Sequence, residues 1–158
     1  MSGHGAPELN VDGSEARIAV VASSWHQPVM DGLLAGAHRA LEDASVTDVI
    51  VLRAPGSFEL PLLAQACAAD GFDAIVALGV IIRGGTPHFE YVSAAATDGL
   101  ARVALDTGVP IGFGLLTCDD ERQALDRAGL PDSSEDKGRE AAEAALSTWS
   151  VLRGLRQD

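Results

Sequence analysis

The chain has 158 residues, of which 47% are hydrophobic, and a formal net charge of −12 at pH 7. This length fits one domain, and the hydrophobic fraction is ordinary for a soluble fold. The acidity disfavours nucleic acid and anionic membrane surfaces as partners. Any site for a phosphorylated ligand must therefore supply local positive charge, mainly from arginine, because Lys137 is the only lysine.

Two cysteines, Cys67 and Cys118, lie far apart in the sequence without a metal-binding spacing. They suit a reducing compartment and indicate neither a disulfide framework nor a zinc site. Residues 1–15 lack the basic start and apolar centre of a signal peptide, and no run approaches the ~20 apolar residues of a membrane span. We expect a cytoplasmic protein with a single domain over residues 16–158. Residues 1–15 should form a flexible arm, the alternative being an edge strand that orders against another subunit.

Short apolar runs alternate with helical patterns along the chain. The sequence predicts strands over 17–22, 48–52, 74–82 and 110–117. It predicts one helix that starts at Pro28, a second that starts after Ser57, and three more over 88–106, 120–128 and 137–156. Ser57 is a plausible N-cap for the second of these helices. Strands and helices in this alternation favour βαβ units, and hence an α/β fold with a parallel sheet covered on both faces.

The third strand ends in an unusual polar segment, Arg83-Gly84-Gly85-Thr86, and His88 follows it at the start of a helix. Free backbone N–H groups, a hydroxyl and a guanidinium in one place are typical of an anion site, most often for phosphate. The imidazole next to it could transfer protons. The plain alternatives are a glycine-rich turn and a capping or surface histidine.

Ligands of parallel sheets bind at the carboxyl ends of the strands, and other polar or aromatic residues follow that rule. We expect them at or just past strand ends: Trp25, His26, Gly56, Ser57, Phe58, Glu59 and Phe113. The rings of Trp25 and Phe58 could stack on a flat heterocycle or belong to the core. Glu59 could accept hydrogen bonds from ligand hydroxyls or serve only as a favourable charge at a helix start. No dinucleotide or P-loop motif is present, so we expect no cofactor and no metal.

Several segments together resemble the 6,7-dimethyl-8-ribityllumazine synthase family, from about residue 17 to the C-terminus. The segment Ile82-Arg-Gly-Gly-Thr-Pro-His-Phe-Glu-Tyr-Val92 carries most of the likeness. Residues 22–26, 54–61, 123–129 and 136–138 support it. The resemblance implies a flavodoxin-like three-layer α/β/α sandwich with a central four-stranded parallel sheet. It also implies condensation of 5-amino-6-(D-ribitylamino)uracil with 3,4-dihydroxy-2-butanone 4-phosphate, with release of phosphate and water.

The same resemblance implies roles for individual residues. Trp25 matches the position that stacks on the pyrimidine, Glu59 the position that binds the ribityl hydroxyls, and His88 the proposed proton-transfer residue. The other substrate-binding positions are Ser57 and Phe58 for the ribityl chain, Ile81 and Ile82 for the uracil, Gly85 and Thr86 for the phosphate, and Phe113, Arg127 and Lys137 from a neighbouring subunit.

The resemblance further implies homopentamers with active sites between subunits. The link over 130–136 resembles that of pentameric members rather than of sixty-subunit shells. Some positions depart from the commoner family residues: Gly85, Cys118, Asp126 and Asp136. Two alternatives stay open, a non-catalytic flavin- or lumazine-binding paralogue and a structural shell, because a fold does not by itself imply an activity.

Overall fold

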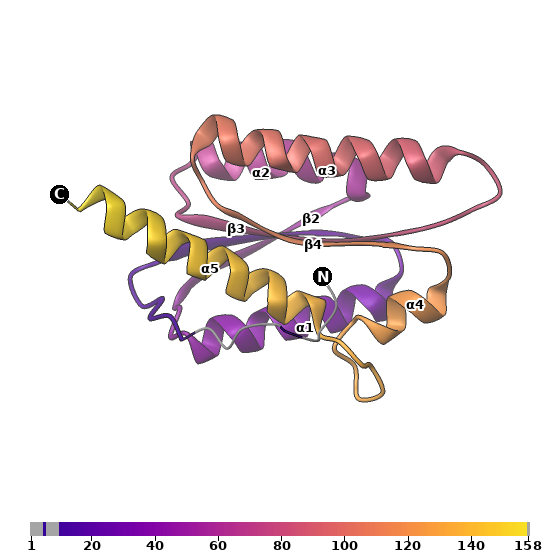
Figure 1. The fold of residues 1–158 in the computed structure, drawn as a ribbon, viewed down its shortest axis with the longest axis horizontal. Helices are drawn as coiled ribbons and strands as arrows, with labels where there is room; N and C mark the ends of the chain where they lie inside the picture. Colours follow the sequence, from indigo (N-terminus) through magenta and orange to yellow (C-terminus); the bar gives the residue numbers. More distant parts are fainter. Residues whose placement is uncertain (1–4, 6–9, 158) are drawn as a thin grey trace.

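The computed structural model describes residue 5 and residues 10–157 of the chain, in which strands and helices alternate (Figure 1). The strands are β1 (Arg17–Ser23), β2 (Asp48–Ala54), β3 (Ala74–Ile82) and β4 (Ile111–Cys118). The helices are α1 (Gln27–Asp43), α2 (Leu60–Ala69), α3 (His88–Thr107), α4 (Glu121–Asp126) and α5 (Lys137–Arg156), with a 3₁₀ helix, η1 (Ser57–Glu59), before α2.

The four strands form one parallel sheet in the order β2-β1-β3-β4. This is the strand order of flavodoxin-like sheets, in which the chain turns back across the sheet between β1 and β3. The connections that follow these two strands diverge to opposite faces and leave a crevice at the carboxyl ends. The expected fold class is confirmed, and the crevice is where such a fold binds its ligand.

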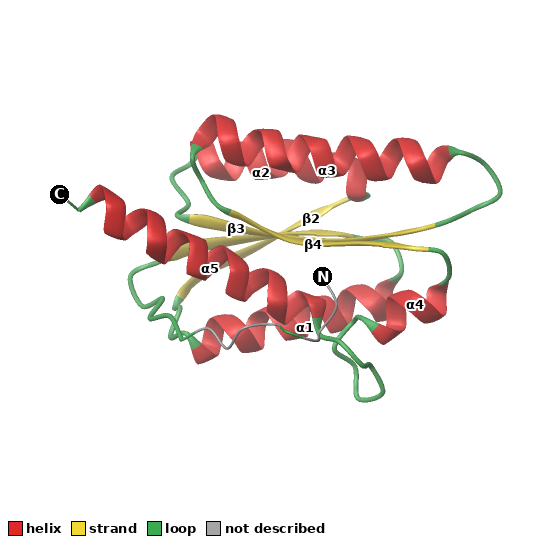
Figure 2. Ribbon diagram, in the orientation of Figure 1, coloured by secondary structure: helices red, strands yellow, loops and turns green. Residues whose placement is uncertain are grey.

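Helices cover both faces of the sheet, as Figure 2 shows. On one face α1, α4 and α5 enclose a core that includes Leu33, Val76 and Leu146. On the other face α2 and α3 enclose a core that includes Leu60 and Leu100. Because β3 lies inside the sheet with helices on both sides, its residues must be apolar on both faces, which explains the continuous apolar run from 74 to 82.

Small residues allow α1 and α5 to approach until backbone meets backbone. A Cβ added to Gly138 in α5 would lie 2.0 Å from the carbonyl oxygen of Leu33 in α1. A Cβ added to Gly36 would lie 2.1 Å from Oδ1 of Asp136. That carboxylate caps α5 by accepting a hydrogen bond from the backbone N–H of Arg139 at 3.1 Å. The close contact therefore fixes the start of α5 and the connection that leads into it.

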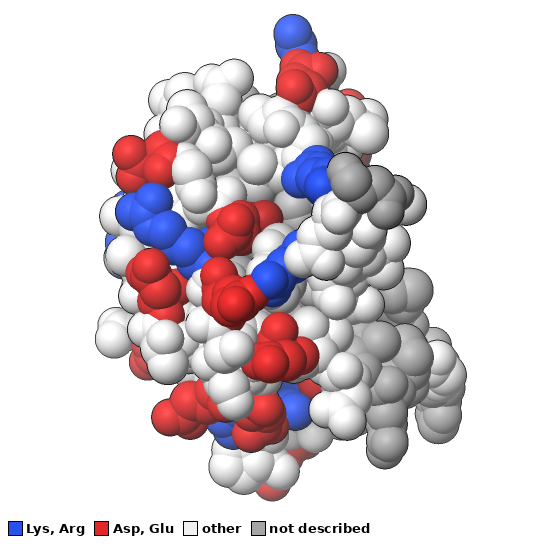
Figure 3. Space-filling model, turned by 90° about the vertical axis from the view of Figure 1, so that its left-hand side faces the viewer, with Lys and Arg blue, Asp and Glu red and all other residues white. Residues whose placement is uncertain are grey.

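Acidic and basic side chains are interspersed on the end of the molecule where the strands begin (Figure 3). Arg17, at the start of β1, lies 3.8 Å from Asp48 and 3.6 Å from Asp70. Mixed charge of this kind does not form a single-sign patch on this face.

Within the described residues, no helix combines the length and the apolar character needed to cross a membrane.

Most of the expected elements agree with the structure to within two residues at each end, but two positions differ. Ser57 does not cap α2: it is buried inside η1, and the carboxylate of Glu59 instead accepts from the N–H of Gly56 at 3.1 Å. Phe113 does not lie at a strand end, since it pairs with Ala77 in the first half of β4.

Most of the expected N-terminal arm lies outside the described residues. Of its described part, Val11 packs against the core on the α1/α5 face, and the N–H of Gly13 donates to the carbonyl of Ala44 at 2.7 Å. The last residues before β1 therefore contact the domain.

Candidate active site

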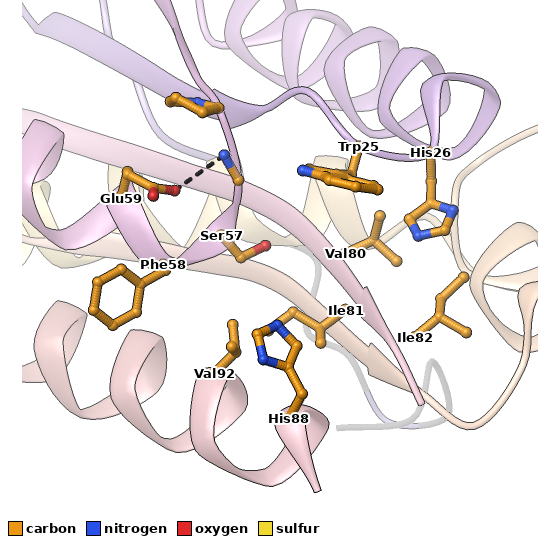
Figure 4. A pocket seen from close by; sticks show the side chains of 12 residues that line it. Trp25, His26, Ser57, Phe58, Glu59, Val80, Ile81, Ile82, His88 and Val92 are labelled. Atoms are coloured by element: carbon orange, nitrogen blue, oxygen red, sulfur yellow. Dashed lines mark hydrogen bonds between the residues drawn. The ribbon is translucent and has the colours of Figure 1, made fainter. Parts of the chain in front are cut away.

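An open pocket of ≈ 690 Å³ lies at the carboxyl ends of the strands, where the connections that follow β1 and β3 diverge. It is lined by segments that follow β1 and β2, by the end of β3 and by the first turns of α3. Its lining residues are Trp25, His26, Pro55, Gly56, Ser57, Phe58, Glu59, Val80, Ile81, Ile82, His88 and Val92. Figure 4 shows this pocket with its side chains.

The segment after β1 places an aromatic ring at the pocket. The indole of Trp25 is 67% exposed although it lines a concave site, which leaves its face free for a flat ligand. The next residue, His26, adopts a left-handed backbone conformation with φ 58°. Histidine is one of the few residues enriched there, and such conformations gather at functional sites. This turn allows the chain to leave β1 and enter α1 at once.

The ends of β1 and β2 are tied together beneath that ring. The hydroxyl of Ser24 donates to the carbonyl of Ala54 at 2.8 Å, and the guanidinium of Arg53 donates to the carbonyl of Ser23 at 2.8 Å. The two loops that carry Trp25 and the segment 55–59 therefore keep a fixed relative position.

The segment after β2 supplies polar and aromatic groups. One carboxylate oxygen of Glu59 accepts from Gly56, which orients the side chain and leaves the second oxygen for a ligand hydroxyl. Ser57 is only 6% exposed, and its hydroxyl has no hydrogen-bond partner among the described residues. Phe58 is 63% exposed. A serine hydroxyl left unpaired in a pocket wall is unusual and suits a residue that is completed by a ligand.

The imidazole of His88 enters the pocket from the first residue of α3. In Figure 4 it lies beside Val92 and Ile81, and Ile82 continues the apolar wall toward His26. The pocket thus combines a broad apolar surface, one exposed indole, a carboxylate and two imidazoles. That combination suits an aromatic ligand with hydroxyl groups and a reaction that moves protons.

Arg83 is not available as the cation of an anion site in the way the sequence suggested. Its Nε donates to Asp119 at 2.9 Å and its Nη1 donates to Glu90 at 2.6 Å. The adjoining glycines leave the loop open, since a Cβ on Gly84 or Gly85 would meet nothing within 4 Å. Gly85 and Thr86 are exposed outside the pocket lining, on the connection from β3 to α3 that projects beyond the sheet (Figure 1).

The two cations expected from a neighbouring subunit are close to each other and do not line this pocket. A bridge between Ala128 and Asp136 closes the connection from α4 to α5, and the N–H of Lys137 donates to the carbonyl of Arg127 at 3.0 Å. Both cations also flank one carboxylate, Glu135, with N···O distances of 3.8 Å for Arg127 and 3.7 Å for Lys137.

Phe113 is likewise absent from the pocket lining. It is 51% exposed on β4, which is an edge strand of the sheet. The chain therefore brings together Trp25, Ser57, Phe58, Glu59, Ile81, Ile82 and His88, and it leaves Gly85, Thr86, Phe113, Arg127 and Lys137 outside the pocket.

Val80 and Val92 line the pocket but were not predicted at the site, whereas His26 was predicted near a strand end without a ligand contact of its own. The signal for His26 was its place in the loop just past β1, which ends at Ser23, whereas the two valines look like ordinary core residues in the sequence. Among the described residues no group of three or more His, Cys, Asp or Glu side chains is arranged to hold a metal ion.

The comparison with known proteins agrees with this geometry. A family profile described as 6,7-dimethyl-8-ribityllumazine synthase matches residues 15–153. Curated relatives of that name include one from Kineococcus radiotolerans, 64% identical over 98% of this chain and 96% of its own length. Others come from Clavibacter sepedonicus, 62% identical over 99% of both chains, and Streptomyces coelicolor, 58% identical over 99% of this chain and 98% of its own. The chain belongs to the 6,7-dimethyl-8-ribityllumazine synthase family.

Proposed function

We propose that this chain catalyses the reaction of its family in riboflavin biosynthesis. It condenses 5-amino-6-(D-ribitylamino)uracil with 3,4-dihydroxy-2-butanone 4-phosphate to give 6,7-dimethyl-8-ribityllumazine, phosphate and water. The observation that carries this proposal is the pocket at the β1/β3 crevice, which joins an exposed indole, a carboxylate and the imidazole of His88. We further propose that residues 16–158 form the catalytic domain, with residues 1–15 as an arm, and that it works in the cytoplasm.

The pyrimidine substrate fits the part of the pocket between the loops. The ring of Trp25 stacks on the uracil, and backbone groups of Ile81 and Ile82 bind its polar edge. Glu59 accepts hydrogen bonds from the ribityl hydroxyls, and Ser57 and Phe58 complete the wall around that chain. Stacking and hydrogen bonding together hold the reacting amine in one orientation. The entropy cost of aligning the reactants is then met by binding, which lowers the activation free energy.

His88 is the proton-transfer residue. The amine attacks the ketone of the second substrate, and a first water leaves as an imine forms. Loss of a carbon-bound proton then expels phosphate, and the resulting enol becomes a carbonyl. The second amine attacks that carbonyl, and a second water leaves as the ring closes. These steps move protons to or from nitrogen, oxygen and carbon, and an imidazole can both accept and donate protons near neutral pH. His88 reaches the pocket from the same connection that carries Gly85 and Thr86, so the phosphate is held within reach of the imidazole.

The positive charge for that phosphate comes from a neighbouring subunit. The pocket lining, as far as the chain is described, contains neither lysine nor arginine. Phosphate recognition in an acidic protein needs a cation, and the resemblance to the family assigns this part to Arg127 with Lys137. Both lie near Glu135, and Lys137 also pairs with Glu140 at 2.7 Å, so the phosphate must compete with these carboxylates. We place Arg127, Lys137 and Phe113 of one subunit against the pocket of the next in a homopentamer.

Exposed apolar side chains support an assembly. Large hydrophobic residues on α2 and α3 remain uncovered in the single chain: Leu62 is 68% exposed, Tyr91 74% and Leu105 84%. Together with Phe113 on the edge strand, they provide the apolar area that subunit interfaces bury.

A direct assay tests the proposed function. Purified protein is mixed with both substrates, and fluorescent lumazine and released phosphate are measured together. The His88→Ala variant should fold and bind the pyrimidine but turn over about 100-fold more slowly, since positioned proton transfer typically contributes 10²–10⁴-fold. Riboflavin or lumazine binding without product in the unaltered protein would instead identify a storage protein.

A further inference from the structure

Arg83 joins three separate elements immediately beside the pocket. Its backbone N–H donates to the carbonyl of Cys118 at 2.9 Å, which fixes the residue at the end of β3. Its side chain donates to Asp119, just beyond β4, and to Glu90 in the first turn of α3. The guanidinium also lies 4.3 Å above the ring centre of Phe89, the residue after His88.

The start of α3 has few other restraints. The first fully buried residue of this helix is Ala96, more than two turns after His88; Phe89 and Val92 are only partly buried. The preceding connection adds little, because Gly84 and Gly85 have no neighbours within 4 Å of a built Cβ. Packing and loop contacts therefore leave the first two turns of α3 weakly fixed, although they carry the imidazole.

The geometry around Arg83 suits a tether better than a simple surface charge pair. A single exposed ion pair contributes little, and these three side chains are each about half exposed. The guanidinium, however, is a planar fork that can bind two carboxylates at its edge while its face stacks on a ring. Three contacts from one side chain thus join the first turn of α3 to the residue just beyond β4. The hydrogen bonds from Arg83 also hold the pKa of Glu90 and of Asp119 below the ordinary carboxyl values, so both stay charged at neutral pH.

We infer that Arg83 is a positioning residue that fixes the first turn of α3, and through it the imidazole of His88, by tying Glu90 and Phe89 to the ends of β3 and β4. It touches no substrate in this role. The part of the inference that concerns turnover rests on the proposed function, whereas the part that concerns the order of α3 does not.

The test compares Arg83→Met with a matched control on the same helix. Methionine keeps the unbranched stem of the side chain to about the position of Nε but removes the guanidinium, and with it every hydrogen-bond donor and the stacking on Phe89. Among the described residues Arg102 pairs only with Asp106, one turn away at 3.3 Å. Its side chain is 83% exposed, so Arg102→Met removes an ion pair of α3 without touching the tether. Both variants are measured as assembled protein.

Two readings are taken from each variant. Amide hydrogen exchange of the peptide over residues 86–95 should become faster in Arg83→Met, whereas peptides from its sheet should keep the rates of the unaltered protein. In Arg102→Met the peptide over residues 86–95 should also keep the rate of the unaltered protein. The value of kcat should fall about tenfold, with a smaller change in KM, because misplacing a catalytic group by about 1 Å can cost up to 100-fold. Arg83→Lys should recover only part of kcat, since an ammonium group lacks the fork.

The outcomes distinguish a failure of the role inferred for Arg83 from a failure of the proposed reaction. Unchanged exchange over residues 86–95 and unchanged kcat in Arg83→Met would overturn the inference, as would an equal loss in Arg102→Met. If the unaltered protein forms no lumazine, the proposed reaction fails, and the exchange data still decide the role of Arg83. Should Arg83→Met not fold, Glu90→Ala and Asp119→Ala each remove one arm of the tether and must show the same two changes in smaller form.

Discussion

Replacing Ser57 by alanine should make the protein more stable and its substrate binding weaker. The hydroxyl of Ser57 is buried in the wall of the pocket without a hydrogen-bond partner among the described residues. Its surroundings are tight, since a Cβ added to Gly79 would lie 2.8 Å from Oγ of Ser57. The folded chain therefore carries a desolvated polar group, which we expect a ligand hydroxyl to complete.

The size of the effect follows from that lost hydration. A buried polar group without a partner costs about 1–3 kcal/mol, and alanine removes the group while keeping nearly the same volume. We expect the free energy of unfolding of Ser57→Ala to rise by about 1 kcal/mol, which corresponds to an increase in Tm of about 2–4 °C for a domain of this size. Affinity for the pyrimidine substrate should fall about fivefold, the equivalent of one neutral hydrogen bond.

Ser24→Ala provides the matched control. Its hydroxyl does have a partner, the carbonyl of Ala54, so its loss should lower the free energy of unfolding by about 1 kcal/mol. Both variants and the unaltered protein are melted at one protein concentration, because assembly makes Tm concentration-dependent. Pyrimidine binding is measured by titration calorimetry. A loss of stability in Ser57→Ala equal to that in Ser24→Ala would refute the argument.

Two further predictions concern packing and thiol chemistry. Gly138→Ala should lower the free energy of unfolding by about 2 kcal/mol, because its new Cβ would lie 2.0 Å from the carbonyl oxygen of Leu33 and force α1 and α5 apart; denaturant unfolding measures this, and an unchanged midpoint would contradict it. Burial raises the pKa of the Cys67 and Cys118 thiols, so the reactive thiolate is scarce at neutral pH. Both thiols should react with a thiol reagent at pH 7 only after unfolding, and fast labelling of the native protein would show that they are accessible.

The apolar patterns predicted the strands and helices because, within each element, the spacing of apolar residues matches the faces that the element buries. The run from 74 to 82 has no polar position, and it becomes the strand that is buried on both faces. The strand order required the resemblance to a family, because periodicity contains no information on which strands are neighbours. Residues placed at strand ends then converge automatically, which is why Trp25, Glu59 and His88 line one pocket.

The sequence failed where a residue's role depends on partners that are distant along the chain. Arg83 looked like a free cation beside a glycine-rich turn, yet Asp119, which follows the neighbouring strand, engages it. Ser57 had the chemistry of an N-cap, but η1 begins before α2 and buries it. Neither outcome can be read from local propensity, because both are set by how the ends of neighbouring strands meet.

The pocket of one chain does not include Arg127 and Lys137, and this separation has a consequence for the symmetry of the assembly. If one subunit offers His88 and the next offers Arg127, the two contacting surfaces differ, and repeated head-to-tail contacts close into a ring rather than a two-fold dimer. Mixing the His88→Ala and Arg127→Ala variants then regenerates some intact sites. Such a site has its pocket, with His88, from an Arg127→Ala chain and its Arg127 from a neighbouring His88→Ala chain.

In randomly mixed rings of equal amounts, such sites make up about a quarter of all sites, because each of the two requirements is met half of the time. Co-refolded mixtures should therefore recover about a quarter of the unaltered activity, although each variant alone is nearly inactive. Mixing the two variants after each has assembled separately should recover far less, since subunits must exchange first. A co-refolded mixture as inactive as its parts would place both residues in the same chain's site and refute the shared arrangement.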